Sequence, residues 1–155
     1  MIIDEDIVAG GVTPFIITKL IERHERERQR YRLLHDYYMG DHRILNRRKR
    51  GKNVANNRIM CNHAKYITDM TQSYLVGNPV TYAVSDDYDI EAIKNAYLEQ
   101  DIPSVDSEIV KNMSIYGRAY ELIYADENSK PRSVRLDPEH TFVCYSQSAF
   151  EKPLF

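Results

Sequence analysis

The side chains best suited to catalysis or metal binding are scattered along this chain of 155 residues. The sequence has 5 histidines and 2 cysteines, and the closest pair of soft metal ligands is Cys61 with His63. A structural zinc site takes four such ligands, usually from two close pairs, and no second pair follows. We therefore expect no metal site. His63 is instead expected in the first turn of a helix, and Cys61 as a small, partly buried apolar residue.

The carboxylates and glycines also fail to form a catalytic pattern. Asp36, Asp41 and His42 lie near basic residues, as in some nucleases, but their spacing does not gather the carboxylates that hold catalytic metal ions. Gly10-Gly11 lacks the Lys-Ser/Thr ending of a phosphate-binding loop, and no Ser or Cys lies in a nucleophile motif. The sequence favours a structural or assembly protein without a cofactor, and an enzyme with a dispersed site is the least favoured hypothesis.

The most strongly charged feature is a basic stretch, residues 41–58, which is expected to be a loop. Its cations are Arg43, Arg47, Arg48, Lys49, Arg50, Lys52 and Arg58. Such a cluster can contact DNA phosphates or an acidic partner. No aromatic residue lies within it to stack on bases, so base-specific or single-strand recognition is not supported. The alternative is a solvated loop that contacts nothing.

Charge and tyrosine content suggest association with other chains. Residues 1–65 hold 14 Lys and Arg against 8 Asp and Glu, whereas residues 66–155 hold 7 against 15, so the net charge of −2 conceals a basic and an acidic end. Opposite ends of this kind can pair between copies. The 12 tyrosines exceed what a small core can hold, and tyrosine suits half-buried interfaces.

The composition predicts a single soluble domain. Hydrophobic residues make up 43% and charged residues 28% of the chain, which is typical of a globular protein. No segment approaches the roughly 20 apolar residues of a membrane helix. The acidic N-terminus is a poor secretory signal, and two cysteines suggest no disulfide framework, so a reducing cytoplasmic setting fits.

The first part of the chain predicts an arm and a long helix. Residues 1–12 are expected to form a flexible arm, and residues 13–155 a single domain. Thr13-Pro14 is a typical helix start, and nothing breaks the helix before Gly40. Such a helix has about 26 residues and a length of about 39 Å. Its middle is polar all round, which is typical of a helix that bridges two packing surfaces.

The segment from Asn62 to Tyr82 predicts a capped helix, a turn and a strand. Asn62 is a good N-cap, and Gly77 is expected to close the helix with a positive φ, with Pro79 just beyond it. Residues 80–85 alternate as in a short strand. The helix carries an apolar stripe at helical spacing, which favours a core helix. The stripe consists of Ala64, Ile67, Met70, Thr71, Tyr74 and Leu75.

The second half predicts two more helices and an antiparallel sheet. Helices are expected over 88–100 and 103–116, with Gly117 as the stop of the second. Strands are expected over 119–125, 131–136 and 141–145. Helices followed by a meander indicate an α+β fold. Because the third strand would leave an open edge, we expect the chain to be a fragment. Packing of residues 146–155 as a short arm is the alternative.

Short signatures along the chain resemble those in the N-terminal third of portal (head–tail connector) proteins of long-tailed double-stranded DNA bacteriophages. Each signature is weak alone, but their order and spacing over about residues 31–145 are fairly specific. They are Tyr37-Tyr38-Met39-Gly40-Asp41-His42 with Ile44, Ala55-Asn56-Asn57-Arg58-Ile59 with Asn62, Tyr74-Leu75-Val76-Gly77-Asn78-Pro79-Val80, Tyr116-Gly117-Arg118-Ala119-Tyr120-Glu121 with Tyr124 and Asp126, and Leu136-Asp137-Pro138.

The resemblance implies a structural subunit of a ring, a dodecamer when full length, at one capsid vertex. Genomic DNA enters and leaves through such a ring, which has no catalytic site. The implied partners are other copies, capsid and scaffolding protein, terminase and head-completion proteins, with no membrane. The implied location is the virion, the host cytoplasm during assembly, or a prophage. Residues 13–155 would be part of the α+β wing, without stem, clip and crown. A separate nucleic-acid-binding module using residues 43–58 is the alternative.

Overall fold

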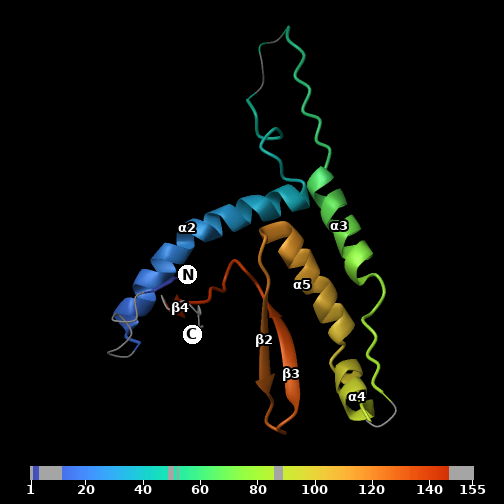
Figure 1. Cartoon of the computed structure of the whole chain (residues 1–155). Helices are drawn as coiled ribbons and strands as arrows, with labels where there is room; N and C mark the ends of the chain where they lie inside the picture. The colour runs from blue at the N-terminus through green and yellow to red at the C-terminus, as the bar shows by residue number, and fades with distance from the viewer. Residues whose placement is uncertain (1, 4–11, 49–50, 52, 86–88, 147–155) are drawn as a thin grey trace.

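The computed structural model describes residues 2–3, 12–48, 51, 53–85 and 89–146, and it has the predicted α+β architecture (Figure 1). Its helices are α2 (Pro14–Met39), α3 (His63–Val76), α4 (Glu91–Glu99) and α5 (Ile102–Tyr116). Its strands are β1 (Ile2–Ile3), β2 (Tyr120–Ala125), β3 (Pro131–Leu136) and β4 (Tyr145–Ser146). No helix in this part of the chain is long and apolar enough to span a membrane.

Helix α2 begins and ends where the sequence predicts. The Thr13 hydroxyl oxygen accepts a hydrogen bond from the Ile16 N–H over 3.4 Å, and Pro14 occupies the first turn. Gly40 ends the helix with a left-handed φ of 89°. The 26 residues between these caps span about 39 Å. The helix arches across one end of the other elements (Figure 1), so it can link regions that are far apart.

Helices α3 and α5 lie side by side and are joined by polar side chains (Figure 1). The Gln72 amide nitrogen donates to the Ser107 hydroxyl oxygen over 2.7 Å, and the Ser114 hydroxyl donates to Thr68 Oγ1 over 3.3 Å. Thr68 is only 4% exposed. Because buried polar groups need hydrogen-bond partners, these pairs fix which face of α3 turns toward α5.

The prediction that the apolar stripe of α3 faces the core is therefore wrong. Ile67, Met70 and Tyr74 are exposed rather than buried. Successive helical residues turn by about 100°, so these side chains lie on a face well apart from Thr68 and Gln72. Polar pairing with α5 overrides the apolar periodicity and leaves Ile67, Met70 and Tyr74 exposed to solvent.

The prediction of a positive φ at Gly77 is also wrong. Helix α3 ends at Gly77 with φ −64° and ψ −26°, which is an ordinary right-handed conformation. The Gly77 N–H donates to the Ser73 carbonyl oxygen over 3.1 Å, which continues the helical pattern. A Cβ at Gly77 would overlap that same oxygen. Glycine is favoured here by close approach to backbone, and not by a left-handed turn.

The strand predicted over 80–85 does not form. Among the described residues this segment pairs with no other strand, and it runs as irregular, exposed chain after Pro79. Alternating residues suit a strand only when a partner supplies the hydrogen bonds of a ladder. No such partner lies beside it in the described part of the chain.

Strands β2 and β3 form the antiparallel hairpin that the sequence predicts. Helix α5 ends at Gly117, whose φ of 72° is left-handed, and β2 follows. Tyr120 pairs with Leu136, and Ala125 with Pro131. Asp126 stabilises the turn, since its Oδ1 accepts hydrogen bonds from the Asn128 and Lys130 N–H groups, each over 2.9 Å.

The prediction that residues 141–145 form the third strand of the meander is wrong. Tyr145–Ser146 (β4) pairs in parallel with Ile2–Ile3 (β1) and makes a separate two-stranded sheet. Ile2 and Ile3 thus lie in a strand within the segment expected to be a flexible arm, and residues 4–11 lie outside the described residues. Nearby, a small core contains Leu20 and the fully buried Cys144, with Ile16 and Phe142 packed against them.

Candidate interaction surfaces

One face of α3 is apolar and open to solvent. We call it the outer α3 face, and it consists of Tyr66, Ile67, Met70 and Tyr74, which are 65%, 60%, 61% and 87% exposed. Spacings of three and four residues place these side chains next to one another along the helix. Soluble proteins that act as monomers rarely expose a contiguous apolar patch, so this face indicates a site of contact with another chain.

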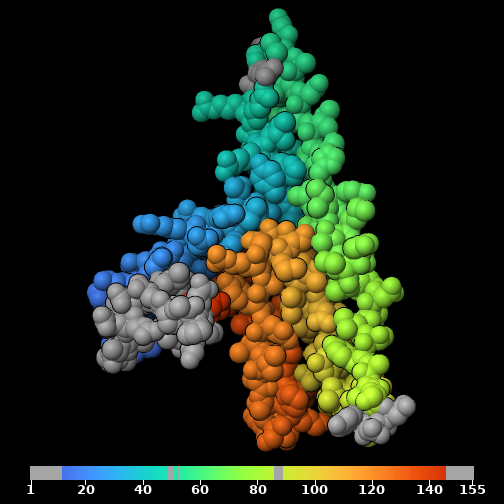
Figure 2. Space-filling view, in the orientation of Figure 1, coloured from blue at the N-terminus to red at the C-terminus, as the bar shows by residue number. Residues whose placement is uncertain are grey.

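The basic loop projects away from the helices. It leaves the end of α2, extends outward and returns to the start of α3 (Figures 1 and 2). Arg43, Arg47 and Arg48 are exposed on it. The other cations of the predicted cluster are Lys49, Arg50 and Lys52, which lie outside the described residues, and Arg58. Arg43, Arg47 and Arg48 are therefore accessible to an anionic partner.

Arg58 differs from the exposed arginines because the loop holds it. Its Nη1 donates to the Leu45 carbonyl oxygen over 3.0 Å, and its side chain is half-buried. Its Nε is buried and has no hydrogen-bond partner among the described residues. Arg58 therefore connects the two arms of the loop, which is a structural role that charge alone does not reveal.

Asn62 ties the base of the loop to both helices. Its Oδ1 accepts from the Lys65 N–H over 2.9 Å and caps α3, while its Nδ2 donates to the Tyr38 carbonyl oxygen over 2.8 Å. Gly40 fits closely beneath, because a Cβ there would lie 3.2 Å from Asn62 Nδ2. The projection of the loop is thus fixed by the ends of α2 and α3.

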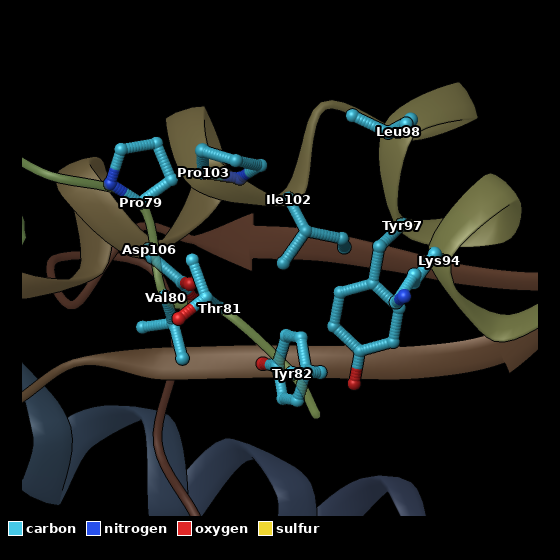
Figure 3. Close-up of a pocket in the computed structure, with 10 residues that line it drawn as sticks. All are labelled: Pro79, Val80, Thr81, Tyr82, Lys94, Tyr97, Leu98, Ile102, Pro103 and Asp106. Atoms are coloured by element: carbon cyan, nitrogen blue, oxygen red, sulfur yellow. The ribbon is translucent and has the colours of Figure 1, made fainter. Parts of the chain in front are cut away.

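A cavity of about 380 Å³ lies where residues 79–82 cross α4 and α5. Figure 3 shows Pro79 and Pro103 at one end and the rings of Tyr82 and Tyr97 at the other. Those two rings lie 5.1 Å apart between centroids. Most of the lining is apolar, and its charged residues are Lys94 and Asp106. Lys94 already pairs with Glu91 over 3.0 Å. The cavity is therefore better suited to binding an apolar side chain than to catalysing a reaction.

The described residues gather no metal centre. No group of three His, Cys, Asp or Glu side chains within them is arranged to hold a metal ion. His63 begins α3 as expected, but Cys61 is exposed rather than partly buried. Pro79 borders the cavity. Gly117 ends α5.

Sequence reasoning found the basic loop but missed the role of the apolar stripe. The signal was present, because a helix with a polar stripe at Thr68 and Gln72 as well as an apolar one has two candidate buried faces. The polar residues Ser107 and Ser114 on the later helix decide between them, as their hydrogen bonds to α3 show. The missed surface is the outer α3 face.

Comparisons with known proteins point to one family. The family model described as phage portal protein, SPP1 Gp6-like, matches residues 17–155. The portal protein of Bacillus phage SPP1 is 30% identical over 152 residues, which cover 90% of this chain and 29% of the SPP1 protein. The chain thus spans less than a third of the length of that curated relative.

Proposed function

The chain belongs to the phage portal protein family of the SPP1 Gp6-like type, and we propose that it serves as part of a ring at the capsid vertex through which genomic DNA is packaged and ejected. Its role in the ring is structural and not catalytic. The observation that carries this proposal, beyond family membership, is the outer α3 face, an apolar helix surface without a partner among the described residues.

Contact between copies explains why this face is apolar. Burying Met70 or Tyr74 fully against a neighbour removes apolar area that water otherwise covers, at about 25 cal/mol per Å². Tyrosine and methionine are enriched in the cores of protein interfaces, and both occur here. The opposite charges of residues 1–65 and 66–155 favour a head-to-tail arrangement, in which unlike surfaces of adjacent copies meet.

The partners of the assembled ring follow from the same proposal. A full-length ring is a dodecamer that contacts capsid and scaffolding protein during head assembly, and terminase and head-completion proteins afterwards. Double-stranded DNA passes through its channel. The ring is located in the virion and, during assembly, in the host cytoplasm. Residues 13–155 contribute to the wing, with the hairpin and helices described above as its framework.

Oligomeric state tests the proposal. We expect light scattering of the purified chain to give a mass above that of one copy, rising with concentration. Electron microscopy of the associated fraction should show closed particles, because heterologous contacts that close make rings. A strictly monomeric chain at all accessible concentrations would contradict the use of this segment in subunit contacts.

The second candidate function is a nucleic-acid-binding module, and the projecting loop with exposed Arg43, Arg47 and Arg48 favours it. A protein that binds DNA phosphates displaces the cations condensed on the DNA. Because the release of these cations is less favourable at high salt, the binding weakens steeply as the salt concentration rises. Replacing the three arginines by glutamine should weaken DNA binding and flatten the salt dependence. Absence of DNA binding by the unaltered chain at about 0.05 M salt would exclude this function.

A further inference from the structure

We propose that the outer α3 face of one copy packs against an apolar face of the β2–β3 hairpin in the next copy. This pairing rests on the proposed function, and it names the surface that the outer α3 face meets. We call that second surface the outer hairpin face, and it consists of Leu122, Tyr124 and Val134. These side chains are 47%, 48% and 41% exposed.

The pairing of the two strands places these three side chains together. Successive residues of a strand point to opposite sides of the sheet, so Leu122 and Tyr124 share one side. Val134 is directly opposite Leu122 in the antiparallel register. Side chains opposed in this way have Cβ atoms about 5 Å apart, so the three residues form one patch.

The other side of the hairpin turns toward the helices. Glu121, Ile123 and Ser133 line a cavity of about 580 Å³ together with residues of α4 and α5. The Ser133 N–H also donates to Gln100 Oε1 over 2.9 Å, at the end of α4. The outer hairpin face therefore points away from α4 and α5.

The outer α3 face points away from α5 in the opposite direction. Thr68 and Gln72 form hydrogen bonds with α5. Since successive residues turn by about 100°, Ile67, Met70 and Tyr74 lie on the far side of the helix. Figure 1 shows α5 between α3 and the hairpin. One copy thus presents two apolar faces in opposite directions, as a head-to-tail contact requires.

A head-to-tail contact leaves less apolar surface in water than a contact between two α3 faces, which would leave both hairpin faces exposed. It also offers enough area. Tyr66 and Tyr74 are 65% and 87% exposed, so at about 200 Å² per tyrosine they present roughly 300 Å². This is a large part of the roughly 800 Å² that each partner contributes to a stable interface.

The two faces also match in charge. The four residues of the outer α3 face are all uncharged. On the hairpin, Arg132 is opposite Tyr124, and its Nε already donates to Asp126 Oδ2 over 2.9 Å. Interface cores are poor in charged residues and rich in tyrosine and methionine, and these two faces have that composition.

Sedimentation velocity with one variant of each face tests the pairing. We expect Leu122→Gln and Ile67→Gln each to weaken association by about tenfold, because each places a polar amide in an apolar contact. Ile123→Gln is the matched control, since Ile123 is 70% exposed on the same strand but on the side that faces the helices. It should associate like the unaltered chain. Circular dichroism of each variant checks that the fold is retained.

A mixture of the two weakened variants gives the sharper result. Leu122→Gln keeps an intact α3 face and Ile67→Gln keeps an intact hairpin face, so one contact can form between them. At a concentration at which each variant alone is monomeric, we expect the equimolar mixture to contain a species of two copies and nothing larger. A fluorescent label on one variant shows whether that species contains both.

Several results would overturn the pairing. If Leu122→Gln alone associates as the unaltered chain does, the hairpin is not the partner surface, although the proposed function stands. If the mixture forms no complex, the two faces do not meet. If Ile123→Gln loses as much association as Leu122→Gln, the effect comes from the hairpin as a whole and not from its outer face. A monomeric unaltered chain would contradict the proposed function and, with it, this pairing.

Discussion

The side chain of Asn62 donates a hydrogen bond to the Tyr38 carbonyl oxygen over 2.8 Å, and so connects the start of α3 to the end of α2. The same side chain accepts from the Lys65 N–H and caps α3. One amide thus satisfies groups at two helix ends and sets the direction in which the basic loop leaves the helices. The cap was predictable from the local sequence, whereas the bond to Tyr38 depends on how the helices meet.

Substitution of Asn62 separates its two bonds. We expect Asn62→Ala to lower the free energy of unfolding by about 2 kcal/mol, because both the cap and the bond to Tyr38 are lost. Asn62→Asp should cost less, since a carboxylate still caps the helix but cannot donate to Tyr38. Urea denaturation followed by circular dichroism measures both. Equal losses in the two variants would show that the cap contributes nothing.

Gly117 should resist substitution for reasons of backbone alone. Its φ is 72°, and a Cβ there would meet no atom of the described residues within 4 Å, so Gly117→Ala should destabilise by about 1 kcal/mol through left-handed strain. Gly51→Ala is a control, because a Cβ at that position also meets no described atom within 4 Å. Thermal denaturation should show a lower melting temperature for Gly117→Ala and little change for Gly51→Ala. A comparable loss in both would contradict the assignment.

Gly77 should also resist substitution, but for a steric reason. An added methyl group would overlap the Ser73 carbonyl oxygen, so the end of α3 must shift. We expect Gly77→Ala to destabilise by about 1 to 3 kcal/mol, as overpacking does. Chemical denaturation measures the loss. A fully stable Gly77→Ala variant would indicate that the turn after α3 relaxes without cost.

Tyr116 should make stability depend on alkaline pH. Its ring is 9% exposed, and burial, with Asp137 and Glu139 nearby, raises the pKa of its hydroxyl from 10.0 to about 12. Below pH 10 the hydroxyl is protonated in both states, so its contribution is fully present. Above that pH the unfolded chain ionises first, and roughly 2 to 3 kcal/mol of stability is lost as pH rises toward the folded pKa.

Denaturation at a series of alkaline pH values, compared between the unaltered chain and Tyr116→Phe, checks this dependence. Phenylalanine cannot ionise, so the variant should lose less stability over this interval. The ring contact between Tyr31 and Tyr116, 5.8 Å between centroids in an edge-on arrangement, should survive the change. Parallel pH curves for the two proteins would contradict a raised pKa at Tyr116.

Local features of this fold could be predicted from the sequence, because they depend on neighbouring residues. Thr13, Gly40 and Asn62 act as caps through groups within a few positions of themselves. The hairpin of β2 and β3 depends on a short polar turn around Asp126. In each case the atoms that make the interaction are close in the chain, so the local sequence pattern is enough to predict the cap or the turn.

Features that depend on distant partners could not be predicted. The face of α3 that is buried is decided by Ser107 and Ser114 on α5, through hydrogen bonds to Gln72 and Thr68. Residues 80–85 have the alternation of a strand but no strand beside them in the described part of the chain. Tyr145 pairs with Ile2 from the opposite end of the chain. The charge of its residues identifies the basic loop from the sequence alone. Identifying the outer α3 face requires the position of α5 as well.

Self-association through the outer α3 face is the central claim, and sedimentation velocity on a pair of variants tests it most directly. Ile67→Gln changes a residue of that face that is 60% exposed, and Ile21→Gln changes a residue on α2 that is 53% exposed. Both replace an exposed apolar side chain on a helix by the same polar one, so neither should disturb the fold. We predict that the unaltered chain and Ile21→Gln associate alike as concentration rises, while Ile67→Gln stays closer to the monomer. Equal association of all three proteins would contradict the claim.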